Sequence, residues 1–106
     1  MVSTVRFVID GTAEILLHPA RIVIVRCLQK HPEGLFVEQI VKEIADEVKV
    51  HPRMVSHHLD VLESEGLVKS SYQLTTVEGS KRRVAVRLCV ATPHADEVLK
   101  DIRESI

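Results

Sequence analysis

Two adjacent histidines, His57 and His58, are the residues with the most versatile chemistry in the sequence. An imidazole can bind a metal ion, exchange a proton near neutral pH or hydrogen-bond to another molecule. The pair lies in an amphipathic segment for which a first-turn proline, Pro52, and a terminal glycine, Gly66, predict a helix over residues 52–65. Neighbouring residues of a helix lie about 100° apart around its axis. The two imidazoles therefore do not converge on one ion.

The two faces of this helix predict different roles for its polar side chains. One face is apolar and is expected to pack on the preceding helix: Val55, Leu59 and Leu62. Arg53, Ser56 and His57 point the opposite way, and a cation, a hydroxyl and an imidazole in the first turns of a helix can contact DNA bases or phosphates. A simple solvated face is the alternative. His58 borders the apolar face, where a histidine is usually packed and hydrogen-bonded.

A group of cations, Lys81, Arg82 and Arg83, follows the turn-forming residues of the segment TTVEGSKRR. The runs on both sides of this turn alternate in polarity with a period of two, which predicts a β-hairpin over residues 68–91. Cations at a hairpin tip suit the phosphate backbone or a minor groove. Charged edge residues that protect a strand against aggregation are the other explanation, and both can hold together.

The elements that position these residues follow from caps and periodicity. We expect a short strand, a short helix, two longer helices, the histidine-bearing helix, the hairpin and a last helix, over these residues: 4–9, 12–17, 19–30, 37–48, 52–65, 68–91 and 93–105. Helix–turn–helix followed by a hairpin is the winged-helix arrangement. The sequence thus predicts a mostly α-helical fold with a β-hairpin, a winged helix-turn-helix of order α-α-α-α-β-β-α. We expect residues 1–106 to form a single domain.

Apolar residues at helical or strand spacing define the expected core. In the two longer helices that precede residue 52, the stripes are Ile24, Val25 and Leu28, then Ile40, Val41, Ile44, Ala45 and Val48. One face of the second hairpin strand is apolar: Val84, Val86, Leu88 and Val90. Cys89 falls on the opposite face, beside Arg87. Gly34 is expected in the left-handed conformation after helix 19–30.

The composition indicates a globular protein without catalytic machinery. The 106 residues suffice for one core, and 45% of them are hydrophobic and 27% charged. No apolar run has membrane-spanning length and the first residues lack the layout of a signal peptide, so we expect a cytoplasmic protein. Cys27 and Cys89 have neither a close partner nor metal-ligand spacing, and no nucleophile–base pair or phosphate-binding loop is recognisable. We expect no metal, no cofactor and no enzyme activity.

Two segments, MVSHHLDVLESEGLV and LLHPARIVIVRCL, resemble the ArsR/SmtB-type repressors of bacteria and archaea. The resemblance covers about residues 14 to 90, and other winged helices, such as MarR-like ones, share its motifs. It implies that Ser56 and His57 contact DNA and that His58 is structural. It also implies homodimers that bind palindromic operators and release them when an effector binds.

The chain departs from that family at several positions. Ala20 replaces the usual threonine, Val23 replaces a polar residue, and helix 37–48 is about one turn longer. The metal signatures of the family are missing: no Cys-x-Cys lies near the histidine-bearing helix, and the last helix has His94 without a second histidine. We therefore expect no metal sensing.

The terminal segments predict a homodimer. The last helix, 93–105, carries an apolar stripe that a small domain covers only in part, and the segments 4–9 and 12–17 need cover too. Pairing two chains would bury both sets and place two DNA-reading helices on one side. The predicted interface residues are Ile15, Leu16, Val98, Leu99, Ile102 and Ile106. The alternative is a monomer whose last helix folds back on its own core.

These observations predict a sequence-specific transcriptional regulator that binds double-stranded DNA, with helix 52–65 in the major groove and the hairpin 68–91 on the backbone or in the minor groove. The resemblance adds an ArsR-like repressor and an effector whose identity the sequence does not give. The alternative is a winged-helix module that binds protein within a larger transcription assembly. It is favoured by the net charge of −1 and by the acids of helix 37–48: Glu38, Glu43, Asp46 and Glu47.

Overall fold

The structure is a computed structural model that describes these residues: 15–76, 79 and 81–105. The predicted strand over residues 4–9 and most of the predicted helix over residues 12–17 lie outside this part, within which Ile15 and Leu16 are helical. The other elements follow in this order: α3 (Pro19–Gln29), β1 (Leu35–Phe36), α4 (Val37–Ile44), α5 (Pro52–Ser64), β2 (Val68–Thr76), β3 (Arg83–Ala91) and α6 (Pro93–Ser105).

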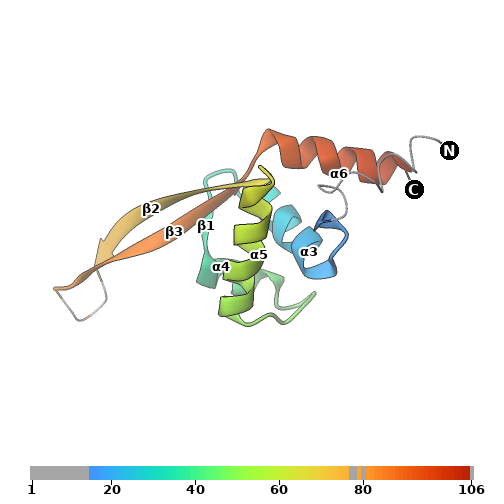
Figure 1. Ribbon diagram of the computed structural model, residues 1–106. Coiled ribbons are helices and arrows are strands. Elements are labelled where there is room, and N and C mark those ends of the chain that lie inside the picture. Colours follow the sequence, from blue (N-terminus) through green and yellow to red (C-terminus); the bar gives the residue numbers. More distant parts are fainter. Residues whose placement is uncertain (1–14, 77–78, 80, 106) are drawn as a thin grey trace.

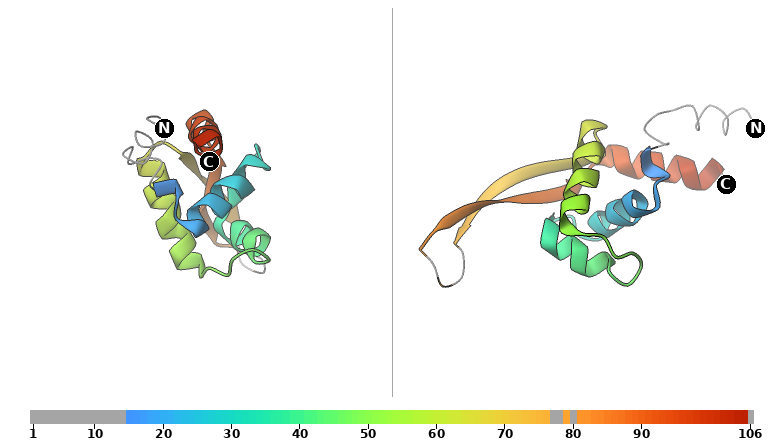
Figure 2. Two further views of the ribbon diagram at one scale, coloured as in Figure 1. Left: turned by 90° about the vertical axis from the view of Figure 1, so that its right-hand side faces the viewer. Right: turned by 60° about the horizontal axis from the view of Figure 1, so that its bottom comes forward.

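Helices α3, α4 and α5 form the body of the molecule, and the β2–β3 hairpin, which we call the wing, projects from it (Figure 1). Helix α6 leaves the base of the wing and runs in the opposite direction, beside α3 (Figures 1 and 2), where Gln29 Nε2 donates to Asp96 Oδ1 at 2.6 Å. This is the winged helix-turn-helix that the sequence predicts. Among the described helices, none has both the length and the apolar character needed to cross a membrane.

The sheet has three antiparallel strands in the order β1-β3-β2. The predicted hairpin is present, and β2 pairs with β3 from Val68 opposite Ala91 to Thr76 opposite Arg83. Strand β1 is an addition, in which Leu35 pairs with Cys89 and Phe36 with Leu88. Two residues are too few to show a strand period, so β1 was not predicted.

Buried side chains from all of these elements meet in one core. The fully buried ones include Leu16, Ile24, Val25, Leu28, Ile40, Ile44, Val55, Leu59, Leu62, Leu67 and Cys89. The stripes predicted for α3 and α5 are confirmed. In α4, Ile40 and Ile44 are buried, whereas Val41 is partly buried against the core.

Cys89 lies in the core because both faces of β3 are covered at the base of the wing. Its own face turns toward the body, and the opposite face packs on the turn at Gly34, where a Cβ would stand 2.9 Å from Leu88 Cγ. Farther out, Val84 and Val86 are half-buried. The predicted alternation of β3 is therefore correct, but it does not separate a core face from a solvent face at this end.

Histidines cap the two helices that begin with proline. The Nδ1 atom of His18 accepts from the backbone N–H of Ala20 at 3.2 Å, and Nδ1 of His51 accepts from that of Arg53 at 3.1 Å. These bonds satisfy backbone donors that a first helical turn leaves unpaired. The two histidines therefore fix where α3 and α5 begin.

Helix α5 ends in the motif that its terminal glycine predicts. Gly66 has a φ of +75°, its N–H donates to Glu63 O at 3.0 Å, and the N–H of Leu67 donates to Leu62 O at 2.9 Å. These two hydrogen bonds, with a buried apolar residue after the glycine, form a Schellman motif. The Thr92 hydroxyl donates to Gly66 O at 2.6 Å, so the end of α5 is tied to the start of α6.

Helix α4 is shorter than predicted and ends at Ile44 instead of Val48. The N–H of Ala45 donates to Lys42 O at 3.4 Å and that of Glu47 to Ile44 O at 2.9 Å, which is the tighter three-residue spacing of a turn. The apolar stripe continues through this turn, because Val48 is half-buried against the core. Periodicity alone therefore extended the helix too far.

The turn at Gly34 should tolerate no side chain. Gly34 has a φ of +94°, and an added Cβ would lie 2.9 Å from Leu88 Cγ and 3.1 Å from Val90 Cγ1. We expect Gly34→Ala to lower the free energy of unfolding by more than about 2 kcal/mol, since left-handed strain and overpacking add. Gly79→Ala is the matched control, because Gly79 has a φ of +78° but no atom within 4 Å of the added Cβ. Equal losses in urea denaturation would show that packing plays no part.

Candidate nucleic-acid interface

The first turns of α5 present the predicted polar face to solvent. Arg53 and His57 are exposed, Ser56 is half-buried, and Met54 is 47% exposed. The opposite face is held by the buried side chains of Val55, Leu59 and Leu62. The structure thus brings Arg53, Ser56 and His57 together on one accessible face of the second helix of the helix-turn-helix.

The electrostatics of this face suit an anion. The first turn of α5 contains no acidic residue, and the unpaired N–H groups of a helix start carry partial positive charge. Arg53 adds a full positive charge at the same place. The acids of α5, Asp60 and Glu63, come one or more turns later.

His58 is part of the helix packing, as the sequence predicts. Its side chain is 4% exposed, and its Nδ1 accepts from Arg21 Nε at 3.1 Å. The His58 ring lies 4.8 Å from the His18 ring and 5.9 Å from the His57 ring, measured between centroids. Burial, together with the nearby charges of His18, Arg21 and His57, holds the pKa of His58 below its usual value. A neutral His58 therefore joins α5 to α3 and leaves His57 on the surface.

The described residues contain no group of three or more His, Cys, Asp or Glu side chains that could hold a metal ion. Both thiols are protonated at neutral pH. Burial and then the neighbouring carboxylate of Glu43 raise the pKa of Cys27 to about 12, and burial raises the pKa of Cys89.

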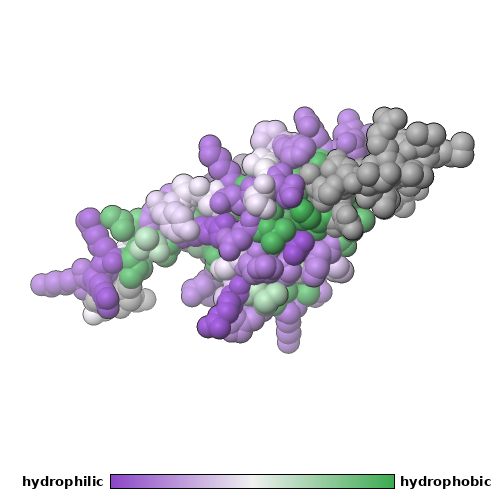
Figure 3. Space-filling model, in the orientation of Figure 1, coloured by the Kyte–Doolittle hydropathy of each residue, from purple (hydrophilic) through white to green (hydrophobic). Residues whose placement is uncertain are grey.

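The wing carries the second predicted group. Lys81, Arg82 and Arg83 are exposed and lie at its far end, away from α5 (Figure 1). Figure 3 shows hydrophilic surface at this tip, with hydrophobic surface beside it. On the outer part of β2, Leu74 is 67% exposed. The six predicted DNA contacts thus form two separate groups, one on α5 and one at the tip of the wing.

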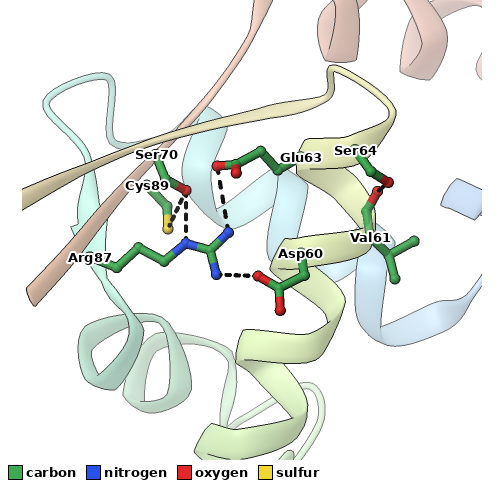
Figure 4. A network of polar contacts seen from close by, with 7 residues as sticks. All are labelled: Asp60, Val61, Glu63, Ser64, Ser70, Arg87 and Cys89. Carbon is green, nitrogen blue, oxygen red and sulfur yellow. Dashed lines mark hydrogen bonds and ion pairs between the residues drawn. The ribbon is translucent and has the colours of Figure 1, made fainter.

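Sequence reasoning missed a polar network between α5 and the wing (Figure 4). Arg87 Nη1 lies 2.6 Å from Asp60 Oδ1, its Nη2 lies 3.5 Å from Glu63 Oε1, and its Nε donates to Ser70 Oγ at 2.8 Å. Asp60 and Glu63 stand three residues apart on α5, a spacing that puts them on one side of a helix, but the sequence does not show which cation faces them.

A second network joins the end of α3 to α4. His31 Nε2 lies 2.7 Å from Glu43 Oε1 and its Nδ1 lies 3.3 Å from Glu33 Oε2, while Cys27 Sγ donates to Glu43 Oε2 at 3.4 Å. Both ring nitrogens of His31 face carboxylates, an arrangement that favours the protonated imidazolium, in which both nitrogens donate. The hydrogen bonds that His31 donates to Glu33 and Glu43 raise the pKa of His31 above its usual 6.5, against the effect of desolvation.

This network should make stability depend on pH. Because the pKa of His31 is raised in the folded state, its contribution is complete below 6.5 and is lost as the pH rises through the raised value. We expect His31→Gln to lower the melting temperature more at about pH 6 than at about pH 9. His94→Gln, at an exposed histidine of α6, is the control. If the melting temperature of His31→Gln lay below that of the wild-type chain by the same amount at both pH values, a charged His31 would be contradicted.

Some of the predicted dimer residues are already buried within the single chain. Leu16, Val98 and Leu99 are 0%, 4% and 9% exposed in the single chain. Ile15 and Ile102 are only partly buried, and Ile106 lies outside the described residues. Of the six predicted residues, the described ones that keep part of their surface exposed are therefore Ile15 and Ile102.

Comparisons with known proteins agree with this architecture. Residues 16–71, more than half of the chain, match a helix-turn-helix domain family, and the chain belongs to this family. A comparison with curated proteins gives no match.

Several solved structures share the fold over most of the chain. A transcriptional regulator homologue from Pyrococcus horikoshii OT3 matches with a TM-score of 0.68 and 21% identity, over 98% of this chain and 93% of that one. A PadR family regulator from Clostridium difficile R20291 matches with a TM-score of 0.63 and 20% identity, over 80% of this chain and 83% of that one. A MarR family regulator from Rhodococcus sp. RHA1 matches with a TM-score of 0.61 and 14% identity, over 99% of this chain and 63% of that one. At these identities the likeness establishes the winged helix-turn-helix fold.

Proposed function

We propose that this protein is a transcriptional regulator that binds double-stranded DNA in a sequence-specific way. The observation that carries the proposal is the exposed, acid-free first turn of α5 with Arg53, Ser56 and His57 on one face, held by α4 in a helix-turn-helix. A helix-turn-helix reads the major groove with the N-terminal residues of its second helix, which we call the recognition helix. The cations at the tip of the wing then contact the backbone or the adjacent minor groove.

Two further observations support this function. Residues 16–71 match a helix-turn-helix domain family, and three structural neighbours are described as transcriptional regulators, of the PadR and MarR families in two cases. The family match is to helix-turn-helix domains as a whole, so the narrower assignment as an ArsR-like repressor rests on the sequence motifs that contain Ser56 and His57. We keep that assignment, with its effector, as part of the proposal.

A homodimer completes the proposal, because two-fold operators require two recognition helices on one side. The half-buried Ile102 and Ile15 offer apolar surface that a second chain would cover. We expect the double substitution Ile15→Ala with Ile102→Ala to weaken the dimer about tenfold or more in sedimentation equilibrium. Val41→Ala, at a half-buried apolar residue of α4, is the control. An intact chain that is monomeric at micromolar concentration would exclude this interface.

A protein-binding winged helix is the second candidate. The net charge of −1 and the exposed acids of the α4 region, Glu38, Glu43, Asp46 and Glu47, favour it. The affinity for random duplex DNA, measured over a series of salt concentrations, separates the two. A DNA-binding regulator loses affinity steeply as salt rises, whereas a protein-binding module has little duplex affinity at any salt concentration.

A further inference from the structure

Arg87 lies at the point where the wing leaves the body. Strand β1 supports β3 as far as the pair of Phe36 with Leu88, and Arg87 is the next residue outward. Its own partner in β2 is Tyr72, and four more residue pairs follow, up to Thr76 opposite Arg83. Arg87 therefore occupies the first pair in which the hairpin is only two strands wide.

The Arg87 side chain joins this point of the wing to the recognition helix. One guanidinium contacts two carboxylates of α5 and a hydroxyl of β2: Asp60 at 2.6 Å, Glu63 at 3.5 Å and Ser70 at 2.8 Å (Figure 4). The Arg87 side chain is only 12% exposed. The planar fork of an arginine fixes direction as well as distance, because its donors point along set directions.

We propose that Arg87 is a positioning residue that sets the angle between the wing and α5, so that both DNA-binding groups engage one duplex together. This inference rests on the proposed function. The wing acts as a lever: four residue pairs beyond Arg87 span about 14 Å of strand. A tilt of about 10° at Arg87 would displace Arg83 by about 2–3 Å, which is the length of a hydrogen bond to a phosphate.

Arg87 has a second effect on the interface, and the test must separate it from the first. Asp60 lies one turn after Ser56 and His57 on the same side of α5, so its carboxylate would repel a nearby phosphate if Arg87 did not neutralise it. Loss of Arg87 therefore both releases the wing and exposes negative charge. If only the exposed charge weakens binding, neutralising Asp60 and Glu63 in the Arg87 variant should restore the DNA affinity. If the wing angle is what matters, neutralising these two acids should leave the affinity low.

The first experiment measures duplex affinity against salt for the full chain. We expect Arg87→Ala to weaken binding at least about tenfold and to flatten the salt slope as much as alanine at Lys81, Arg82 and Arg83 does, by about 2–3. Adding Asp60→Asn and Glu63→Gln to Arg87→Ala should not restore the affinity, and adding the tip substitutions should not weaken it further. The proposal would be overturned if Asp60→Asn and Glu63→Gln restored the DNA affinity of Arg87→Ala. It would also be overturned if the losses of affinity from Arg87→Ala and from the tip substitutions were fully additive. Arg26→Ala, at an exposed arginine of α3, is the control.

A second measurement does not depend on DNA. Spin labels on Met54→Cys and Thr75→Cys report the distance between α5 and the outer wing, and Cys27 and Cys89 are buried and should stay unlabelled. We expect one narrow distance distribution that broadens in Arg87→Ala and in Asp60→Asn with Glu63→Gln, while circular dichroism shows an intact helical body. In Arg87→Lys the distance distribution should be narrower than in Arg87→Ala but broader than in the wild-type chain, because one ammonium does not span all three partners.

An unchanged distance distribution would overturn the proposal whatever the DNA results. If the wild-type chain binds no duplex at any salt concentration, the proposed function fails. The spin-label distances would then still decide whether Arg87 holds the wing.

Discussion

Alanine in place of Arg53 or His57 is expected to cost about 1–3 kcal/mol of specific DNA binding, or roughly 5- to 150-fold in affinity, and to leave the fold intact. Both side chains are exposed on the first turns of α5, so their removal creates no cavity. The loss arises because a base edge in the major groove keeps an unpaired donor or acceptor.

The test compares a specific duplex with a random one. A base contact weakens only the specific duplex, whereas equal weakening on both would identify a phosphate contact. No effect on either would remove the residue from the interface. Arg26→Ala on α3 and His94→Ala on α6 are matched controls, since both residues are exposed and lie on other helices. Thermal melting checks that all four variants are folded.

Replacing Lys81, Arg82 and Arg83 together by alanine is the second change with a large expected effect. If each cation neutralises one phosphate, the slope of log affinity against log salt should fall by about 2.7. Binding should weaken on all sequences alike, because phosphates carry no base information. The fold should persist, since all three residues are exposed at the end of the wing.

A matched triple variant separates local contacts from net charge. Arg26, Lys30 and Lys42 are also exposed, and alanine at these positions removes the same charge from α3, its C-terminal end and α4. In the wing variant, the slope of log affinity against log salt and the DNA affinity should both fall. The matched variant should keep most of its slope and of its affinity. An unchanged slope in the wing variant would show that the wing points away from DNA.

Much of the fold follows from short-range patterns. Prolines and histidines set the starts of α3 and α5, glycines with positive φ end the turn at Gly34 and the helix at Gly66, and alternation predicts the hairpin. These signals act within one turn or one strand, so a local pattern contains them. The end of α4 was predicted wrongly, because the same apolar stripe fits a helix and the turn that follows it.

The features that the sequence did not reveal depend on long-range pairing. Strand β1 exists because two residues meet β3 more than fifty positions later, and Arg87 meets Asp60 and Glu63 from another element. Nothing in the local spacing of Arg87 selects these partners over solvent. The polar face of α5 was predictable because helical periodicity alone places Arg53, Ser56 and His57 together. Their contact with DNA stays a prediction.

The central claim is that this chain reads a two-fold site on double-stranded DNA. Selection of the 106-residue chain on a library of random duplexes tests it most directly, since it measures duplex binding, sequence preference and symmetry at once. We predict an enriched palindromic motif whose half-sites lie about one helical turn apart, roughly 10–10.5 base pairs between centres. A library that shows no enriched motif after repeated selection at low salt would contradict the claim.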